Sequence, residues 1–108
     1  MHYYAVALTT DLRPGTMKAV TADGKQILLA NVNGNYFAIQ QKCPHMGGDL
    51  SKGKLNGAIV TCPRHAAAFN VTTGEAVERA SILFAKFKTK NAATFPVRVE
   101  GTSVMIGV

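Results

Sequence analysis

Two short segments of the chain carry the residue types that bind metals. One reads Cys43-Pro44-His45-Met46-Gly47-Gly48, and the other reads Cys62-Pro63-Arg64-His65. Each segment offers one thiol and one imidazole, and a proline follows each cysteine. Because proline fixes the backbone φ angle and removes an amide donor, it stiffens a ligand loop. The pattern C-x-H-x16-C-x2-H therefore predicts two rigid loops that present four metal ligands: Cys43, His45, Cys62 and His65.

Two kinds of metal centre fit such a ligand set. Zinc is commonly held by two cysteines and two histidines in tetrahedral geometry. A [2Fe-2S] cluster can instead take two cysteines on one iron and two histidines on the other. Zinc motifs usually pair like ligands locally, whereas each segment here has one ligand of each kind. The spacing favours the cluster, and structural zinc stays open as an alternative.

Short β-strands separated by turns must position these segments. We expect strands at residues 16–22, 25–32, 35–40, 58–61, 68–71, 94–100 and 103–108. Asp23-Gly24 and Asn33-Gly34 favour tight hairpins, so the first three strands should form an antiparallel meander. Pro96 lies inside a strand run, which we therefore expect at a sheet edge. Residues 78–90 could be helical or extended, and we expect a surface excursion with one turn of helix. The sequence predicts an all-β fold.

The composition is that of an ordinary globular domain. The chain has 108 residues, of which 47% are hydrophobic and 17% charged, and this length suits one domain. No apolar run reaches the roughly 18–20 residues that span a bilayer. The N-terminus has neither the basic region nor the apolar stretch of a signal peptide. We therefore expect a cytoplasmic protein that has no membrane partner, in which two cysteines indicate metal before disulfide.

Positive charge exceeds negative charge. Twelve Lys/Arg stand against six Asp/Glu, for a net charge of +6. The basic residues are spread from Arg13 to Arg98 without a run of five, which argues against nucleic-acid binding. Four of them flank the two candidate ligand segments: Lys42, Lys52, Lys54 and Arg64. These four are either an ordinary solvated face or a basic rim that steers an acidic partner.

A longer pattern surrounds the two segments. It reads Cys43-Pro44-His45-x-Gly47-x-x-Leu50-x-x-Gly53, followed by Cys62-Pro63-x-His65-x-x-x-Phe69-x-x-x-x-Gly74. This pattern resembles the Rieske ferredoxins. The two hairpins before the first segment and the closing Phe95-Pro96-Val97-Arg98-Val99-Glu100-Gly101 are also similar to the small members of that family. Residues 78–94 have no clear counterpart.

The resemblance implies a fold and a cofactor. The fold would be a Rieske-like antiparallel sandwich or barrel, a single domain over residues 1–108, with its cluster-binding loops within about 41–74 at one tip. One Rieske [2Fe-2S] cluster would be bound by each chain. Its buried iron would be held by Cys43 and Cys62, and its outer iron by His45 and His65, whose exposed imidazoles would pass electrons in and out.

The resemblance also implies a function. The protein would be a one-electron carrier without catalytic activity of its own, and it would relay electrons from a reductase to a terminal oxygenase. Contacts with these redox partners would be transient, and the partners acidic. One alternative is the small ferredoxin-like subunit of a nitrite reductase. Another is a zinc-stabilised interaction module without a redox role.

Several positions depart from other Rieske proteins. The respiratory type has disulfide-bonded cysteines at the positions of Gly48 and Arg64, and hydroxyl side chains at those of Ala67 and Phe69. Without these hydroxyl donors, we expect a potential near the low end of the Rieske range of roughly −150 to +300 mV. The family usually has glycine where this chain has Ala66. If that position needs a positive φ, alanine costs about 1 kcal/mol and shifts the loop.

Overall fold

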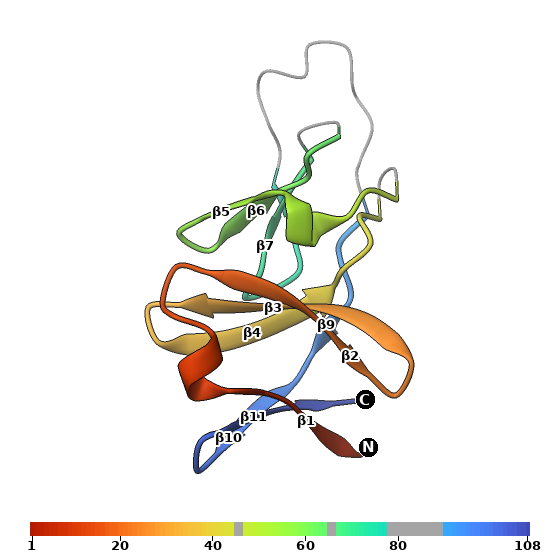
Figure 1. Ribbon diagram of the computed structural model, residues 1–108. Helices are drawn as coiled ribbons and strands as arrows, with labels where there is room; N and C mark the ends of the chain where they lie inside the picture. The colour runs from red at the N-terminus through yellow and green to blue at the C-terminus, as the bar shows by residue number, and fades with distance from the viewer. Residues whose placement is uncertain (45–46, 65–66, 78–89) are drawn as a thin grey trace, which may run out of the picture.

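The computed structural model of the protein describes residues 1–44, 47–64, 67–77 and 90–108 (Figure 1). Within these ranges the strands pair only in antiparallel fashion. The helices there are two short 3-10 segments, η1 (Thr9–Asp11) and η2 (Leu50–Lys52). No helix in the described ranges is long and apolar enough to cross a membrane. The prediction of an all-β, antiparallel fold is confirmed.

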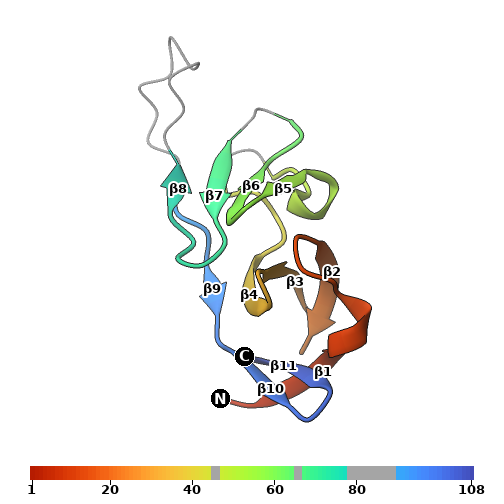
Figure 2. The same cartoon turned by 90° about the vertical axis from the view of Figure 1, so that its left-hand side faces the viewer.

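The described strands form three sheets that follow one another along the molecule (Figures 1 and 2). The first sheet has the order β1 (Tyr3–Leu8), β11 (Ser103–Gly107), β10 (Val97–Glu100). The second has the order β2 (Met17–Ala22), β3 (Lys25–Val32), β4 (Asn35–Gln40), β9 (Thr94–Phe95). The third has the order β5 (Lys54–Asn56), β6 (Ile59–Thr61), β7 (Ala68–Asn70), β8 (Ala76–Val77). The second sheet lies between the other two.

The meander of β2, β3 and β4 forms as predicted. Asp23 and Gly24 have φ angles of 51° and 76°, and Asn33 and Gly34 have 54° and 92°. Two consecutive positive φ angles define the type I′ turn, which matches the twist of a two-residue hairpin. The pairing Val32↔Asn35 closes the second hairpin. The turn chemistry therefore sets the register of the central sheet.

The predicted strand at residues 94–100 is wrong as a single element, because Pro96 divides it. Upstream, Phe95 in β9 pairs with Ala38 of the second sheet. Downstream, Val97 in β10 pairs with Ile106 of the first sheet. Proline has no amide hydrogen to continue a ladder, so the chain changes sheets there. Both resulting strands, β9 and β10, lie at sheet edges, which is the position that Pro96 led us to expect.

Strands β1, β5 and β8 and both 3-10 helices were not predicted from the sequence. They are short or depend on pairing with distant residues, as β1 does with β11. The expected helical turn at residues 78–90 falls almost wholly on residues 78–89, which lie outside the described ranges.

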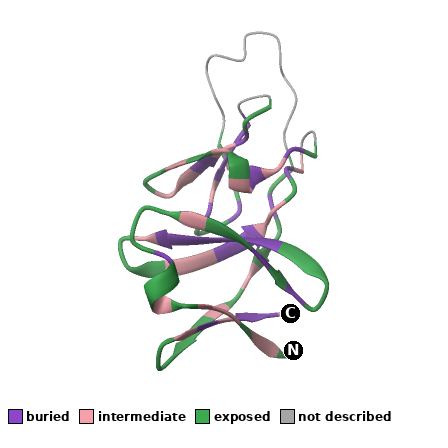
Figure 3. Cartoon of the chain, in the orientation of Figure 1, coloured by how far each residue is buried: buried purple, intermediate pink, exposed green. Residues whose placement is uncertain are grey.

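Strand β3 separates two cores. Its side chains alternate, so that Ile27 and Leu29 pack in one cluster while Leu28 and Ala30 pack in the other. The first cluster includes Val104 and Ile106 of β11, and the second joins the meander to the third sheet through Ile39, Leu50, Val60 and Phe69. Burial of both faces explains the continuous apolar run of β3, which Figure 3 shows as buried along most of its length. The second core also contains both cysteines.

Candidate metal centre

The first candidate ligand loop, residues 43–48, leaves and re-enters the fold at one point. An isolated β-bridge joins Lys42 to Asp49, and the Leu50 amide donates to the Gln41 carbonyl at 2.9 Å. Inside the loop, the Cys43 amide donates to the Gly48 carbonyl at 2.7 Å, and the Gly47 amide donates to the Cys43 carbonyl at 2.8 Å. Gly47 adopts a φ of +73°, which glycine reaches at least cost. Backbone hydrogen bonds therefore hold the two ends of this loop together.

The Asp49 carboxylate holds the segment after this loop. Its Oδ1 accepts from the Ser51 hydroxyl at 2.6 Å, the Ser51 amide at 2.9 Å and Gln41 Nε2 at 3.0 Å. This is an N-cap of η2, in which a side-chain oxygen satisfies an amide that a helix leaves unpaired. The Ser51 hydroxyl is the main reason why the pKa of Asp49 lies below its ordinary value of 3.8. The charged carboxylate thereby fixes the chain where it leaves the first loop.

The second candidate ligand loop, residues 62–67, connects two paired strands. Thr61 at the end of β6 pairs with Ala68 at the start of β7. The Cys62 amide donates to the Ala67 carbonyl at 2.7 Å. The first loop has the same closure, since Cys43 also donates to the carbonyl five positions later. Both cysteines thus begin a loop of the same length that is closed by the same type of backbone bond.

The structure brings the two predicted cysteine ligands into one core. Each is only 2% exposed, and both belong to the cluster that contains Leu50, Val60 and Phe69. The two loops also approach each other closely, because a Cβ built on Gly48 would lie 2.8 Å from Cys62 Sγ. The cysteines, the only two in the sequence, do not form a disulfide with each other.

This environment fits a metal centre. A thiolate in an apolar core is costly unless a cation or hydrogen bonds compensate its charge, and bound iron or zinc supplies that cation. The other two predicted ligands, His45 and His65, lie outside the described residues. Within the described ranges no group of three or more His, Cys, Asp or Glu side chains is arranged for a metal ion. The histidine ligands therefore remain predictions.

The four positions that the sequence analysis contrasted with the respiratory type are described, whereas Ala66 lies outside the described residues. Ala67 and Phe69 are 5% and 0% exposed and belong to the same buried cluster as both cysteines. Neither supplies a hydroxyl group. A Cβ built on Gly48 would lie 3.4 Å from Cγ and Cδ of Arg64. The two positions that resemble the disulfide sites of the respiratory type are thus neighbours across the loops.

Comparison with known proteins decides the family. Residues 2–83 match the Rieske [2Fe-2S] domain. The chain belongs to the Rieske [2Fe-2S] family. This Rieske protein is 36% identical over 102 residues to the ferredoxin component of the naphthalene 1,2-dioxygenase system of Pseudomonas putida, a match that covers 94% of the chain and 90% of that relative.

Solved structures agree with this assignment. A chain from the complex of reduced oxygenase and oxidized ferredoxin in carbazole 1,9a-dioxygenase is similar with a TM-score of 0.83 and 28% identity, over 96% of this Rieske protein and 91% of that chain. The ferredoxin of carbazole 1,9a-dioxygenase from Nocardioides aromaticivorans has the same fold, with a TM-score of 0.85 at 24% identity over 98% and 97% of the two chains. The cofactor of this Rieske protein is a [2Fe-2S] cluster. The protein is an electron carrier, not a catalytic enzyme.

Proposed function

We propose that this Rieske protein is the ferredoxin component of a multicomponent oxygenase system, in which it takes electrons from a reductase and delivers them one at a time to a terminal oxygenase. One observation carries this proposal: the chain is similar over nearly its whole length to the ferredoxin component of a dioxygenase system. When bound, the cluster accepts and gives up a single electron. Because the relatives serve dioxygenases for naphthalene and biphenyl, an aromatic compound is the substrate class that we propose for the oxygenase.

We also propose the ligand set. Cys43 and Cys62 would hold one iron, which their burial in a shared apolar core supports. His45 and His65 would hold the other iron, which the sequence pattern supports. Neutral imidazoles in place of two thiolates leave less negative charge on the centre, and this raises its potential above that of an all-cysteine cluster.

Electron paramagnetic resonance of the dithionite-reduced protein tests both parts. We expect the rhombic signal with a lowered average g value that histidine ligation produces. His45→Ala and His65→Ala should abolish this signal, whereas His2→Ala, which removes an exposed histidine near the N-terminus, should leave it intact. A signal that survives both loop substitutions would contradict the ligand set. Zinc without iron in the purified protein would instead favour a structural metal site.

The partner is tested separately. Reduced protein should transfer electrons to an aromatic-ring oxygenase at a rate that depends on its concentration. Transfer to a nitrite reductase, with none to an oxygenase, would favour the alternative role. We further propose that residues 1–108 act as a single domain and that the protein is cytoplasmic, where reducing conditions keep cysteines available to iron; cell fractionation would test the location.

A further inference from the structure

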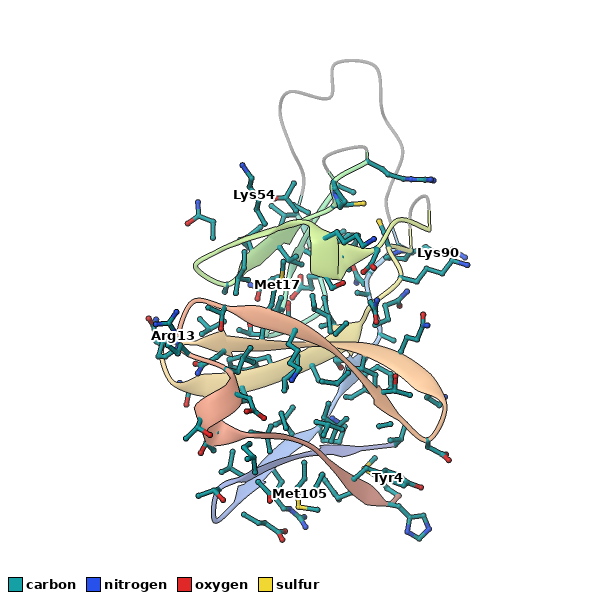
Figure 4. All side chains as sticks on the ribbon, viewed as in Figure 1. Tyr4, Arg13, Met17, Lys54, Lys90 and Met105 are labelled. Carbon is teal, nitrogen blue, oxygen red and sulfur yellow. The ribbon has the colours of Figure 1, made fainter. Side chains whose placement is uncertain are left out.

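Four basic side chains surround the two ligand loops, and we call them the loop cations: Lys42, Lys52, Lys54 and Arg64. Lys42 precedes Cys43, and Arg64 follows Cys62 by two positions. Lys52 ends η2, and Lys54 begins β5 opposite Thr61. All four are exposed, and Figure 4 shows Lys54 beside the third sheet, the sheet that carries the second loop.

Two of the loop cations lie directly over the first loop. A Cβ built on Gly47 would lie 3.0 Å from Cε of Lys42, and one built on Gly48 would lie 3.4 Å from Cγ and Cδ of Arg64. Their aliphatic stems therefore cover the loop backbone while the charged ends remain in water. Lys42 also lines an open hollow of about 280 Å³ together with Gln26, Gln41, Gly47, Gly48 and Asp49. The positive charge is thus located at the loops themselves.

None of the loop cations forms an ion pair with the residues that the structure describes, and the one acidic group that feels any of them is Asp49, which Lys52 attracts. The ion pair found there joins Arg98 to Glu100 at 3.4 Å, in the first sheet. Asp49 is the only acidic residue between positions 41 and 64, and its carboxylate is bonded to Gln41 and Ser51. Residues 78–89 contain one glutamate against three basic residues, so that segment adds positive charge overall.

The remaining described residues are nearly balanced in charge. Beyond the loop cations and Asp49, they comprise five basic and four acidic residues: Arg13, Lys18, Lys25, Lys90 and Arg98 against Asp11, Asp23, Glu75 and Glu100. The excess positive charge of the described chain therefore gathers at the loop end. Basic residues that serve only to solvate the surface would not need to be concentrated at one end of the molecule.

We propose that the loop cations form a docking face for an acidic protein surface, which the electron donor and the electron acceptor present in turn. This inference rests on the proposed function. Because electron transfer weakens steeply with distance, both partners must approach the loops that hold the cluster. Four exposed cations attract an acidic surface from a distance and speed encounter. Exposure to water keeps each contact weak, so that one partner leaves before the next binds.

Two trivalent oxidants of opposite charge test the face without a cognate partner. Reduced protein gives one electron to hexacyanoferrate(III), which becomes hexacyanoferrate(II), or one electron to hexaammineruthenium(III), which becomes the ruthenium(II) complex. Raising the ionic strength from about 0.01 to 1 M shortens the screening length from about 30 to 3 Å. We expect the rate with the anion to fall and the rate with the cation to rise.

Substitutions of single basic residues test whether this dependence on ionic strength arises from the loop cations. At low ionic strength, Lys52→Gln and Lys54→Gln should each slow hexacyanoferrate by about fourfold, as expected for a unit charge roughly 10 Å from the trivalent ion in water. Arg13→Gln is the matched control: it removes one exposed charge beside the second sheet, away from β5 in Figure 4, and should change the rate little. Calorimetry with poly-L-glutamate should show binding that Lys52→Gln and Lys54→Gln weaken and Arg13→Gln preserves.

The outcomes separate the two proposals. A protein that holds no reducible cluster would contradict the proposed function. A reducible cluster whose rates have the same ionic-strength dependence for both oxidants would overturn the docking face and leave the function standing. Equal effects of Lys52→Gln and Arg13→Gln would also overturn it, since net charge alone would then govern the rates.

Discussion

Gly53→Ala should be strongly destabilising for a purely steric reason. A Cβ at this position would overlap the carbonyl oxygen of Thr61 and lie 3.0 Å from the carbonyl carbon and 3.3 Å from the Leu50 oxygen. The φ angle of Gly53 is −83°, which any residue can adopt, so backbone strain is not the cause. Overpacking usually costs 1–3 kcal/mol. Because backbone atoms cannot rotate away, we expect a loss of about 3 kcal/mol, out of the roughly 5–15 kcal/mol that stabilise a typical domain.

The clash would also reach the metal centre. Gly53 follows η2, and the next residue, Lys54, pairs with Thr61. Thr61 directly precedes Cys62, whose side chain is buried in the core shared with Cys43. Separating β5 from β6 would therefore displace the start of the second loop. We expect Gly53→Ala to contain less iron per chain than the parent protein.

Thermal unfolding, followed by circular dichroism and by loss of the visible cluster absorbance, measures both effects. A loss of 3 kcal/mol corresponds to a decrease in Tm of about 12 °C or more for a domain of this size. Gly57→Ala is the control, since it adds the same methyl group in the turn between β5 and β6 with nothing within 4 Å. Its φ of +60° should cost only about 1 kcal/mol. Equal decreases in Tm for the two variants would refute the steric argument.

Three further substitutions have defined outcomes. Asp49→Ala should cost about 1 kcal/mol through loss of the η2 cap. The folded pKa of Asp49 lies below 3.8, so its contribution to the free energy of unfolding is present at neutral pH and is lost as pH falls from 3.8 through the folded pKa. The stabilities of parent and variant, measured against pH, should therefore converge at low pH. Parallel curves would contradict this role. Gly48→Ala should accelerate release of iron to a chelator, because the new methyl group would lie 2.8 Å from Cys62 Sγ, whereas Gly101→Ala, with nothing within 4 Å, should not. Phe69→Tyr should raise the reduction potential in voltammetry, because it adds a hydroxyl donor to the core that contains both cysteines, and such a donor would stabilise the reduced state. A potential that is unchanged or lower would show that this hydroxyl does not tune the cluster.

The central meander and the metal centre could be predicted from the sequence because both depend on local chemistry. The Asp23-Gly24 and Asn33-Gly34 turns predicted the central meander, because both residues of each turn need positive φ. The two Cys/His segments predicted a metal centre, and the pattern around them resembles the Rieske ferredoxins. These features depend on neighbours in the chain or on ligand chemistry, so no knowledge of distant contacts was needed.

Only the tertiary structure decided which distant segments meet. It divided the predicted strand at Pro96 between two sheets, because each half found a different partner strand. It paired β1 with β11 and placed β3 between two cores. It also brought Cys43 and Cys62 into one buried cluster and left the loop cations without an ion pair in the described chain. Such outcomes depend on burial and charge summed over the whole fold, which no local stretch of sequence encodes.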